Sequence, residues 1–240
     1  MENLVVDIGN TSTKIILVEN EEWKDIHRFS TWNEIKEFST KYTTIPTIIS
    51  SVKNKEFTQK VASLFSKVVV LNHQTKLPIV NAYKTPKTLG NDRLANAVAA
   101  NAIYPNQNSL IIDVGTCLKF DFVNAQSVYV GGSISLGFSM RYKALHTLTD
   151  NLPLYHNETT NNWIGNDTKS SITAGVYQGM LAEIKQFITL YESKFSQLNI
   201  ILTGGDLSYF KNEELSQKNS IFADPLLTAK GLKVILDYNV

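Results

Sequence analysis

Two short segments of the chain place an aspartate and a glycine at the same spacing after an apolar run. They are Leu4–Thr11 (LVVDIGNT) and Leu110–Cys117 (LIIDVGTC). Each predicts a strand and a tight turn, and the alternating runs at 14–18 and 120–123 predict that a second strand follows. Backbone N–H groups of such a turn can bind phosphate oxygens, and the aspartate can hold a cation. Two such turns facing each other across a cleft would form a nucleotide site.

One copy alone could be an ordinary hairpin in which glycine supplies a positive φ angle. Two copies, each opening one half of the chain, favour a nucleotide function instead. The sequence contains neither G-x-x-x-x-G-K-[ST] nor G-x-G-x-x-G, which argues against P-loop and Rossmann folds. The phosphate turns would therefore belong to another class of α/β protein.

The hydrophobic periodicity predicts strands followed by helices in both halves. The expected strands are 3–8, 13–19, 25–30, 47–52 and 68–70, then 109–114, 117–124, 127–131, 199–203 and 219–223. The expected helices are one carrying Trp32 to Tyr42, one carrying Phe57 to Phe65, and those at 91–103, 138–148 and 168–195, with a last one beginning at Pro225. The repetition indicates two domains, 1–106 and 107–240.

Two features of the sequence suggest a functional role in addition to a structural one. Residues 73–91 are polar, include Pro78 and Pro86, and form a connection long enough to suggest a functional role. Gly175 and Gly179 are spaced so that another backbone could approach the long helix closely. That backbone could belong to the same chain or to a second subunit.

The composition excludes several classes of partner. Among 240 residues the net charge is +1, and the charges are well mixed, so no basic stripe for nucleic acid is expected. No apolar run is long enough to span a membrane, and the first strand begins without a basic leader, so we expect a cytosolic protein. Cys117 is the single cysteine, which excludes internal disulfides and a Cys-based zinc site. The four histidines lack ligand spacing.

Several motifs together resemble a known family. The two Asp-x-Gly segments look like the phosphate loops of the superfamily that contains actin and the acetate and sugar kinases. Within that superfamily, the chain resembles the type III pantothenate kinases along its whole length. The matching motifs are GNDRLAN at 90–96, GGSI at 131–134, GNDT at 165–168 and LTGG at 202–205. The implied fold is a duplicated actin-like, ribonuclease H-like α/β architecture, with mixed sheets flanked by helices and an ATP cleft between the domains.

The resemblance implies a set of nucleotide contacts. Asp113 would bind a monovalent cation, potassium or ammonium, and Asp7 would act on Mg²⁺, through water. Gly204-Gly205 would let the backbone approach the adenosine, or would merely end a strand. Lys14 would add charge near the phosphates or lie on the solvent face of its strand. The implied ATP-binding residues are Asp7, Ile8, Gly9, Asn10, Thr11, Ser12, Thr13, Lys14 and Thr116.

The substrate side centres on Asp92. A kinase needs a carboxylate near the acceptor hydroxyl, and general-base assistance contributes about 10²- to 10⁴-fold. As a first-turn residue Asp92 could instead only cap its helix, and the family resemblance favours the base. Arg93 would pair with the pantothenate carboxylate or form a surface salt bridge. Tyr83 and Thr168 would contact the substrate, although Thr168 could simply cap the long helix. The implied substrate-binding residues are Tyr83, Gly90, Asn91, Asp92, Arg93 and Thr168.

The sequence also departs from the family pattern at two places. Leu136-Gly137 stands where the family usually has Pro-Gly, and Cys117-Leu118-Lys119 stands where it usually has small or hydroxyl residues. We expect an ATP-dependent pantothenate kinase of coenzyme A synthesis, working as a homodimer. The alternatives are a sugar or short-acid kinase of the same superfamily and a non-catalytic nucleotide-binding regulator. The single cysteine argues against sugar kinases that carry a Cys/His zinc cluster.

Overall fold

The chain forms two compact units. The computed structural model describes residues 2–9, 12–20, 22–210, 215 and 221–240. One unit is Met1–Ile103 with Leu226–Val240, and the other is Tyr104–Pro225. The C-terminal helix thus packs with the first unit, whereas the expected second domain, 107–240, included it.

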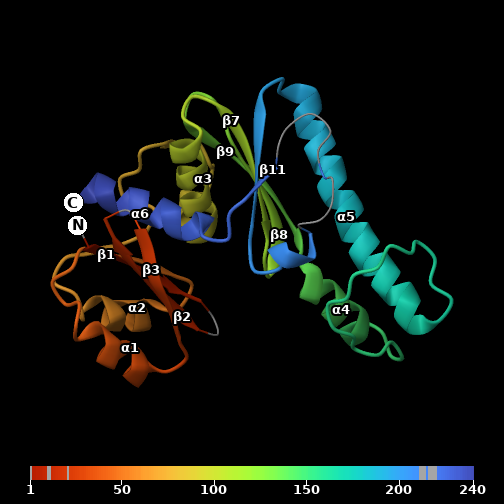
Figure 1. The fold of residues 1–240 in the computed structure, drawn as a ribbon, viewed down its shortest axis with the longest axis horizontal. Coiled ribbons are helices and arrows are strands. Elements are labelled where there is room, and N and C mark those ends of the chain that lie inside the picture. The colour runs from red at the N-terminus through yellow and green to blue at the C-terminus, as the bar shows by residue number, and fades with distance from the viewer. Residues whose placement is uncertain (1, 10–11, 21, 211–214, 216–220) are drawn as a thin grey trace. The chain divides into compact units, whose positions relative to one another are not determined.

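The first unit is built on a five-stranded mixed sheet (Figure 1). Its strands lie in the order β3-β2-β1-β4-β5. The three strands β1, β2 and β3 are antiparallel neighbours, and β1, β4 and β5 run parallel. The bounds are β1 (Glu2–Ile8), β2 (Thr13–Glu19), β3 (Glu22–Phe29), β4 (Thr47–Ser51) and β5 (Val68–Val70).

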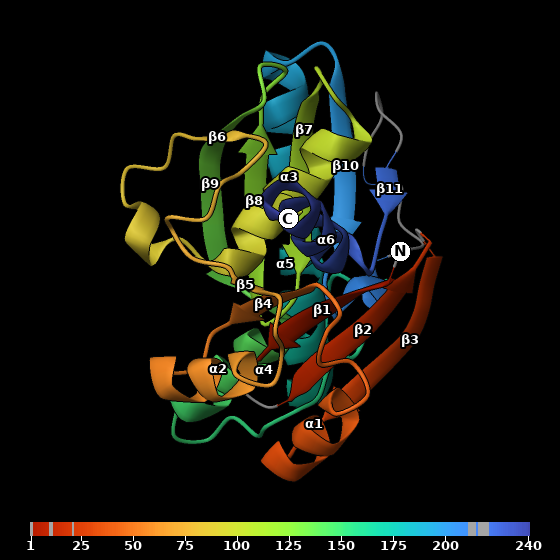
Figure 2. The ribbon, with the colours of Figure 1, turned by 90° about the vertical axis from the view of Figure 1, so that its left-hand side faces the viewer.

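Helices cover both faces of this sheet. On one face, Leu4, Val6 and Ile8 pack with residues of α1 (Trp32–Ser39) and α2 (Lys55–Ala62). On the other face lie α3 (Asn91–Ile103) and α6 (Leu227–Asn239), which contact β4 and each other (Figure 2). Because side chains alternate along a strand, Asp7 lies on the α3 and α6 face. The connection expected at 73–91 holds β6 (Val80–Asn81) and the short helix η1 (Pro86–Thr88).

The second unit repeats the strand order of the first. Its strands lie in the order β9-β8-β7-β10-β11, with β7, β8 and β9 antiparallel and β7, β10 and β11 parallel. The bounds are β7 (Asn108–Val114), β8 (Cys117–Val123), β9 (Val128–Leu136), β10 (Leu198–Thr203) and β11 (Ile221–Ala223). The predicted duplication is therefore confirmed, because each first strand carries one copy of the Asp-x-Gly segment.

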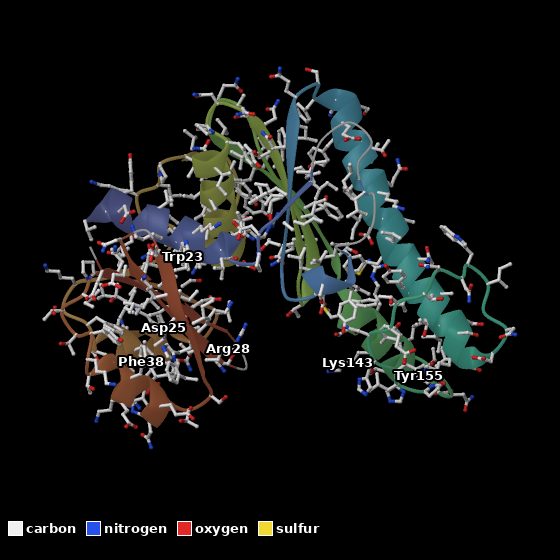
Figure 3. The ribbon with its side chains drawn as sticks, in the orientation of Figure 1. Trp23, Asp25, Arg28, Phe38, Lys143 and Tyr155 are labelled. Atoms are coloured by element: carbon white, nitrogen blue, oxygen red, sulfur yellow. The ribbon has the colours of Figure 1, made fainter. Side chains whose placement is uncertain are left out.

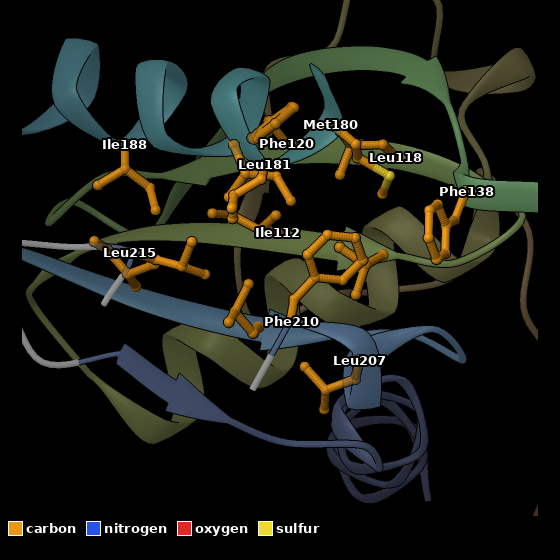
Figure 4. Packing of buried hydrophobic residues seen from close by; sticks show 14 of the residues in the cluster. Ile112, Leu118, Phe120, Phe138, Met180, Leu181, Ile188, Leu207, Phe210 and Leu215 are labelled. Carbon is orange, nitrogen blue, oxygen red and sulfur yellow. The ribbon is translucent and has the colours of Figure 1, made fainter. Parts of the chain in front are cut away.

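The core of the second unit lies between its sheet and the long helix. The helices of this unit are α4 (Phe138–Thr147), α5 (Thr168–Lys194) and the short η2 (Leu207–Tyr209). Ile112, Leu118 and Phe120 point toward Met180 and Leu181 of α5 (Figure 4). The opposite face of the same strands carries Asp113 and Lys119, again because side chains alternate.

Several predicted element boundaries were wrong. Strand β9 continues through Gly131-Gly132 to Leu136, because glycine lets the backbones meet: a Cβ on Gly132 would lie 1.6 Å from the Phe120 carbonyl oxygen. Helix α6 begins at Leu227, so Pro225 precedes the helix instead of opening it. Helices α1 and α2 end before Tyr42 and Leu64, although both side chains still pack on the core. In the part of the chain that the structure describes, every helix is too short or too polar to cross a membrane.

Candidate active site

The first phosphate turn joins β1 to β2. The Gly9 N–H donates to the Ser12 carbonyl oxygen at 3.0 Å, which closes the turn. Asn10 and Thr11, two of the expected ATP contacts, lie outside the described residues. A Cβ on Gly9 would lie 3.1 Å from that same Ser12 oxygen, so the turn suits glycine. Gly9 and Ser12 are themselves partly exposed at the end of the hairpin.

Asp7 and Lys14 face each other across this hairpin. They are direct partners in the β1–β2 register. Burial lowers the pKa of Lys14, and the positive charge of Arg28 lowers it further, while Asp7 acts in the opposite direction. Ile8 and Thr13 are buried behind the turn. Lys14 is therefore a partly buried cation next to an aspartate, not a lysine on the solvent face of its strand.

The start of α3 brings four of the expected substrate residues together. The Leu94 N–H donates to the Gly90 carbonyl oxygen at 3.2 Å, which marks the first helical turn. Asn91 Nδ2 donates to the Leu71 carbonyl oxygen at 3.2 Å and anchors this turn to the chain after β5. A Cβ on Gly90 would lie 2.6 Å from Asp92 Oδ1. The Asp92 carboxylate therefore lies over Gly90, and any larger residue there would displace it.

Arg93 is a buried cation beside an aromatic ring. Only 4% of Arg93 is exposed, and its Cζ lies 5.5 Å from the centroid of the Tyr83 ring. A guanidinium at this distance over a ring is attracted by the ring's negative face. Arg93 is therefore a buried side chain and not one on the surface. Tyr83, Asp92 and Arg93 come from two segments of the first unit, and Asp7 lies on the sheet face that α3 covers.

The second phosphate turn joins β7 to β8. The Gly115 N–H donates to the Cys117 carbonyl oxygen at 3.3 Å, and Thr116 is exposed at the tip. Gly137 caps the start of α4, and a Cβ there would lie 2.1 Å from the Thr116 carbonyl oxygen. The α4 start therefore packs directly on the turn, which requires Gly137. The family's glycine is kept at this contact, and only its preceding residue, Leu136, differs.

Asp113 is buried and paired with Lys119. The two residues are direct partners in the β7–β8 register, and Lys119 Nζ lies 2.7 Å from Asp113 Oδ2. This repeats the placement of Asp7 opposite Lys14. Sequence reasoning missed this ion pair, although the hairpin register, counted outward from the turn, could have found it.

Two glycines enclose the other oxygen of Asp113. A Cβ on Gly204 would lie 2.6 Å from Asp113 Oδ1, and one on Gly115 would lie 3.0 Å from it. Gly204 also has a φ of +106°, which glycine adopts without strain. Gly204 therefore lies beside Asp113, whereas a Cβ added to Gly205 would meet nothing within 4 Å.

Thr168 is the first residue of α5, but it does not cap the helix. The cap is Asp167, which accepts a hydrogen bond from the Ser170 N–H at 2.8 Å, and Ser170 Oγ accepts one from the Asp167 N–H. The alternative role given to Thr168 was therefore wrong. A polar hollow of about 420 Å³ lies beside this first turn. Glu158 and Lys169, 2.9 Å apart, are among its lining residues.

The sequence predicts two cations, Mg²⁺ at Asp7 and a monovalent cation at Asp113, and the structure suits these two predictions unequally. Among the described residues, no group of three or more His, Cys, Asp or Glu side chains could hold an ion. Mg²⁺ is usually held by one or two carboxylates together with phosphates and water, so partly exposed Asp7 fits it. Asp113, already paired with Lys119, fits an additional cation poorly.

The repeated sheets, each opened by an Asp-x-Gly hairpin, define the two-unit fold of the actin-like ATPases and sugar kinases. A glucokinase from an Antarctic psychrotroph has this fold, with a TM-score of 0.53, 12% identity and 99% coverage of both chains. A Campylobacter jejuni protein named as a conserved Baf family transcriptional activator has a TM-score of 0.65, 18% identity and 98% coverage of both chains. At these identities, the likeness concerns the fold alone.

Sequence relatives narrow the class to one family. A sequence model of the type III pantothenate kinases matches residues 3–190. The type III pantothenate kinase of Phocaeicola vulgatus is 39% identical over 99% of this chain and 98% of its own. That of Cytophaga hutchinsonii is 38% identical over 99% of this chain and 100% of its own. The chain belongs to the type III pantothenate kinase family.

Proposed function

We propose that this protein transfers the γ-phosphoryl group of ATP to the primary hydroxyl of pantothenate, the first step of coenzyme A synthesis. The observation that carries the proposal is the start of α3, where Asp92 adjoins the buried cation Arg93 beside Tyr83. A carboxylate, a guanidinium and an aromatic ring match an acceptor that has a hydroxyl at one end and a carboxylate at the other. Membership of the family supports the same substrate.

Asp92 acts as the general base. Its carboxylate accepts the proton of the attacking hydroxyl as the new P–O bond forms, which makes the oxygen a better nucleophile. Gly90 supports this role, because without a side chain it leaves room for Asp92 Oδ1 at the start of α3. A base held in one position is worth more than a mobile one, since its orientation is fixed before the reaction.

Arg93 binds the pantothenate carboxylate. A planar guanidinium can donate two parallel hydrogen bonds to a carboxylate, and burial strengthens them. Tyr83 supports the guanidinium through its ring face and contacts the substrate. Gly90, Asn91 and Thr168 complete the proposed substrate contacts.

The Asp-x-Gly turns bind phosphate, each from within its own unit. The first turn contributes backbone and hydroxyl groups from Asp7 to Lys14, and Asp7 assists Mg²⁺ through water. In the second unit, Thr116 binds phosphate at the tip of its turn, where the α4 N-terminus adds positive partial charge. Beside this turn Asp113 pairs with the Lys119 ammonium. When bound, Mg²⁺ neutralises charge on the phosphates, which are the reacting groups.

The active form is a homodimer built on α4 and α5. An apolar groove of about 600 Å³ between them is lined by Leu145, Leu148 and Val176, among others. Added Cβ atoms on Gly175 and Gly179 would meet nothing within 4 Å, so within the described chain nothing crosses α5 closely there. Of the two explanations for this glycine pair, the structure therefore favours a second subunit. Contiguous exposed apolar surface of this kind is typical of an interface.

Exposed apolar side chains in the segment after α4 support the same interface. Leu148 is 81% exposed, and in the loop between α4 and α5 Trp163 and Ile164 are 74% and 87% exposed. Large apolar side chains this exposed are stabilised when a second copy covers them. The dimer would act in the cytoplasm, where the single cysteine, Cys117, stays reduced.

The test is ADP release from ATP and Mg²⁺ with pantothenate, glucose or acetate as acceptor. The proposal predicts release with pantothenate and only background release with the other two. Release with glucose or acetate instead would identify another kinase of the superfamily. ATP binding without release under any condition would identify a non-catalytic regulator.

A further inference from the structure

The pair formed by Asp113 and Lys119 bears on the ion requirement of the enzyme. Both side chains are largely buried, 10% exposed for Asp113 and 13% for Lys119, and the ammonium nitrogen lies 2.7 Å from Oδ2. A charge-assisted contact of this length is among the stronger kinds of hydrogen bond. The family resemblance implies that this aspartate holds a potassium or ammonium ion. Here the ammonium of Lys119 already contacts that carboxylate.

The hairpin register fixes this placement. Directly opposed residues of an antiparallel pair have Cβ atoms about 4.5–5.5 Å apart, within easy reach of a lysine. Asp113 and Lys119 are such partners, and both lie on the sheet face away from α5. The pairing of β7 and β8 therefore places the Lys119 ammonium beside the Asp113 carboxylate. No loop has to become ordered to bring the two groups together.

The surroundings of Asp113 leave a second cation poorly accommodated. Gly204 and Gly115 lie beside its Oδ1 and present no side-chain oxygen that could help to coordinate a cation there. Its Oδ2 contacts the Lys119 ammonium. A further monovalent cation at this carboxylate would also be repelled by the lysine charge at close range. The residues present thus do not fit the free cation that the family resemblance implies.

Lysine is chemically suited to replace that cation. Its head group is a compact point charge with three N–H donors, which is a tethered form of the ammonium ion. Tethering removes the need to capture an ion from solution, because the charge is always at the site. Cys117-Leu118-Lys119 stands where the family usually has small or hydroxyl residues, so this lysine is a departure from the family pattern.

We infer that the ammonium of Lys119 takes the place of the monovalent cation beside Asp113, and that this kinase works without added potassium or ammonium. The inference rests on the proposed pantothenate kinase activity. According to this inference, the positive charge near the second phosphate turn belongs to Lys119 and not to a bound ion. The requirement for Mg²⁺ is unchanged.

The first measurement uses the full-length wild-type protein. ADP release with pantothenate is compared in choline, sodium, potassium and ammonium chloride at equal ionic strength. We expect rates within about twofold across the four salts. Stimulation of tenfold or more by potassium and ammonium would overturn the inference and leave the kinase assignment intact.

Two variants then test the lysine directly. Lys119→Thr restores a small hydroxyl residue and opens space, so we expect a loss of about 10- to 100-fold in choline and recovery in potassium or ammonium. Lys119→Met removes the charge but fills the space, so we expect a similar loss with little recovery. Lys194→Thr, at an exposed lysine near the end of α5, is the matched control and should behave as wild type. A Lys119→Thr variant that is fully active in choline would overturn the inference.

A binding measurement keeps the test independent of turnover. ATP affinity is measured by calorimetry in the same four salts, and circular dichroism checks that each variant is folded. We expect the affinity of wild type to be insensitive to the cation, and that of Lys119→Thr to rise with potassium. If no salt supports release with pantothenate, the kinase assignment fails, and a potassium-dependent ATP affinity of wild type would overturn the inference separately.

Discussion

Charged residues at equivalent positions in the two hairpins set the electrostatics of both phosphate turns. Asp7 faces Lys14 in the first hairpin, and Asp113 faces Lys119 in the second. Each aspartate lies near the end of a buried strand, and each lysine near the start of the next, so both pairs lie immediately behind a turn. A lysine behind each turn adds positive charge where phosphate would bind, and the aspartate limits the desolvation cost of burying it.

Asp206 is a carboxylate whose environment works against its charge. Its N–H donates to the Val114 carbonyl oxygen at 2.9 Å, which holds it near the second turn. Partial burial raises the pKa of its side chain above the usual value for an aspartate. A raised pKa in the folded state means that this residue stabilises the fold when protonated and loses that contribution as the pH rises through the folded-state pKa.

Replacing Asp206 should therefore stabilise the protein at neutral pH. We expect Asp206→Asn to raise the melting temperature at pH 7 by about 1 to 3 °C, a modest value because water screens a half-buried carboxylate. The gain should shrink as the solution is acidified toward the pKa of the carboxyl. Thermal unfolding followed by circular dichroism at neutral and acidic pH measures this. An unchanged or lower melting temperature at pH 7 would show that the ionised Asp206 carboxylate does not destabilise the fold.

The sequence indicated which residue types to examine but not how they pair. Asp92 and Arg93 stood out because their motif has a family counterpart, and in the structure Arg93 is buried beside Tyr83. Lys119 was noticed only as a departure from the family pattern. Its partner depends on the register across β7 and β8, which strand periodicity alone does not give and which has to be counted outward from the turn.

At the scale of elements, hydrophobic periodicity predicted nearly every strand and helix, because most of them bury one regular face. The errors occur where a glycine or a tertiary contact determines where an element ends or where it packs. Gly131-Gly132 looked like the end of a strand, yet β9 continues because its backbone passes close to β8. The placement of α6 was also beyond prediction, since it depends on contacts with α3 that are distant in sequence.

The crossing of α3 and α6 depends on one glycine. A Cβ on Gly231 would lie 1.8 Å from the Ala95 carbonyl oxygen, and Thr228 Oγ1 donates to Asn96 Oδ1 at 2.7 Å nearby. Because α3 begins with the proposed base, this crossing also positions the site. Helix–helix packing with backbones this close tolerates no added atom without a shift of one helix.

We expect Gly231→Ala to lower the free energy of unfolding by about 2 kcal/mol or more, because overpacking outweighs the better helix propensity of alanine. Urea denaturation measures the difference. Tyr238→Ala, at a side chain that is 54% exposed in the same helix, is the control and should cost about 0.5 kcal/mol or less. A Gly231→Ala variant as stable as wild type would contradict the close crossing.

At the scale of the whole molecule, the two units share one duplicated sheet architecture but differ in what is added to it. Both units keep the same strand order and the same hairpin, while the helices after them differ. The first unit carries the proposed base at the start of α3. The second carries the long helix α5 and the exposed apolar surface beside α4. On β3 of the first unit, the exposed side chains of Asp25 and Arg28 lie on the same strand as Trp23 (Figure 3).

The proposed dimer should depend on this apolar surface. We expect wild type to be a dimer by size-exclusion chromatography with light scattering, and Leu148→Glu to be monomeric, because a charge would be buried at the interface without a partner. Leu190→Glu is the matched control: Leu190 is 52% exposed on α5 and does not line the groove. A monomeric wild type, or a dimeric Leu148→Glu variant, would contradict the proposed surface.

The most direct test of the whole account is the turnover of Asp92→Asn with ATP, Mg²⁺ and pantothenate. The substituted amide keeps the size of the side chain but cannot accept the proton, so kcat should fall about 10²- to 10⁴-fold with the fold intact. Asp25→Asn, at an exposed aspartate on β3, controls for the loss of one charge in the same unit. A folded Asp92→Asn enzyme that retains near-normal turnover would contradict the assignment of the base.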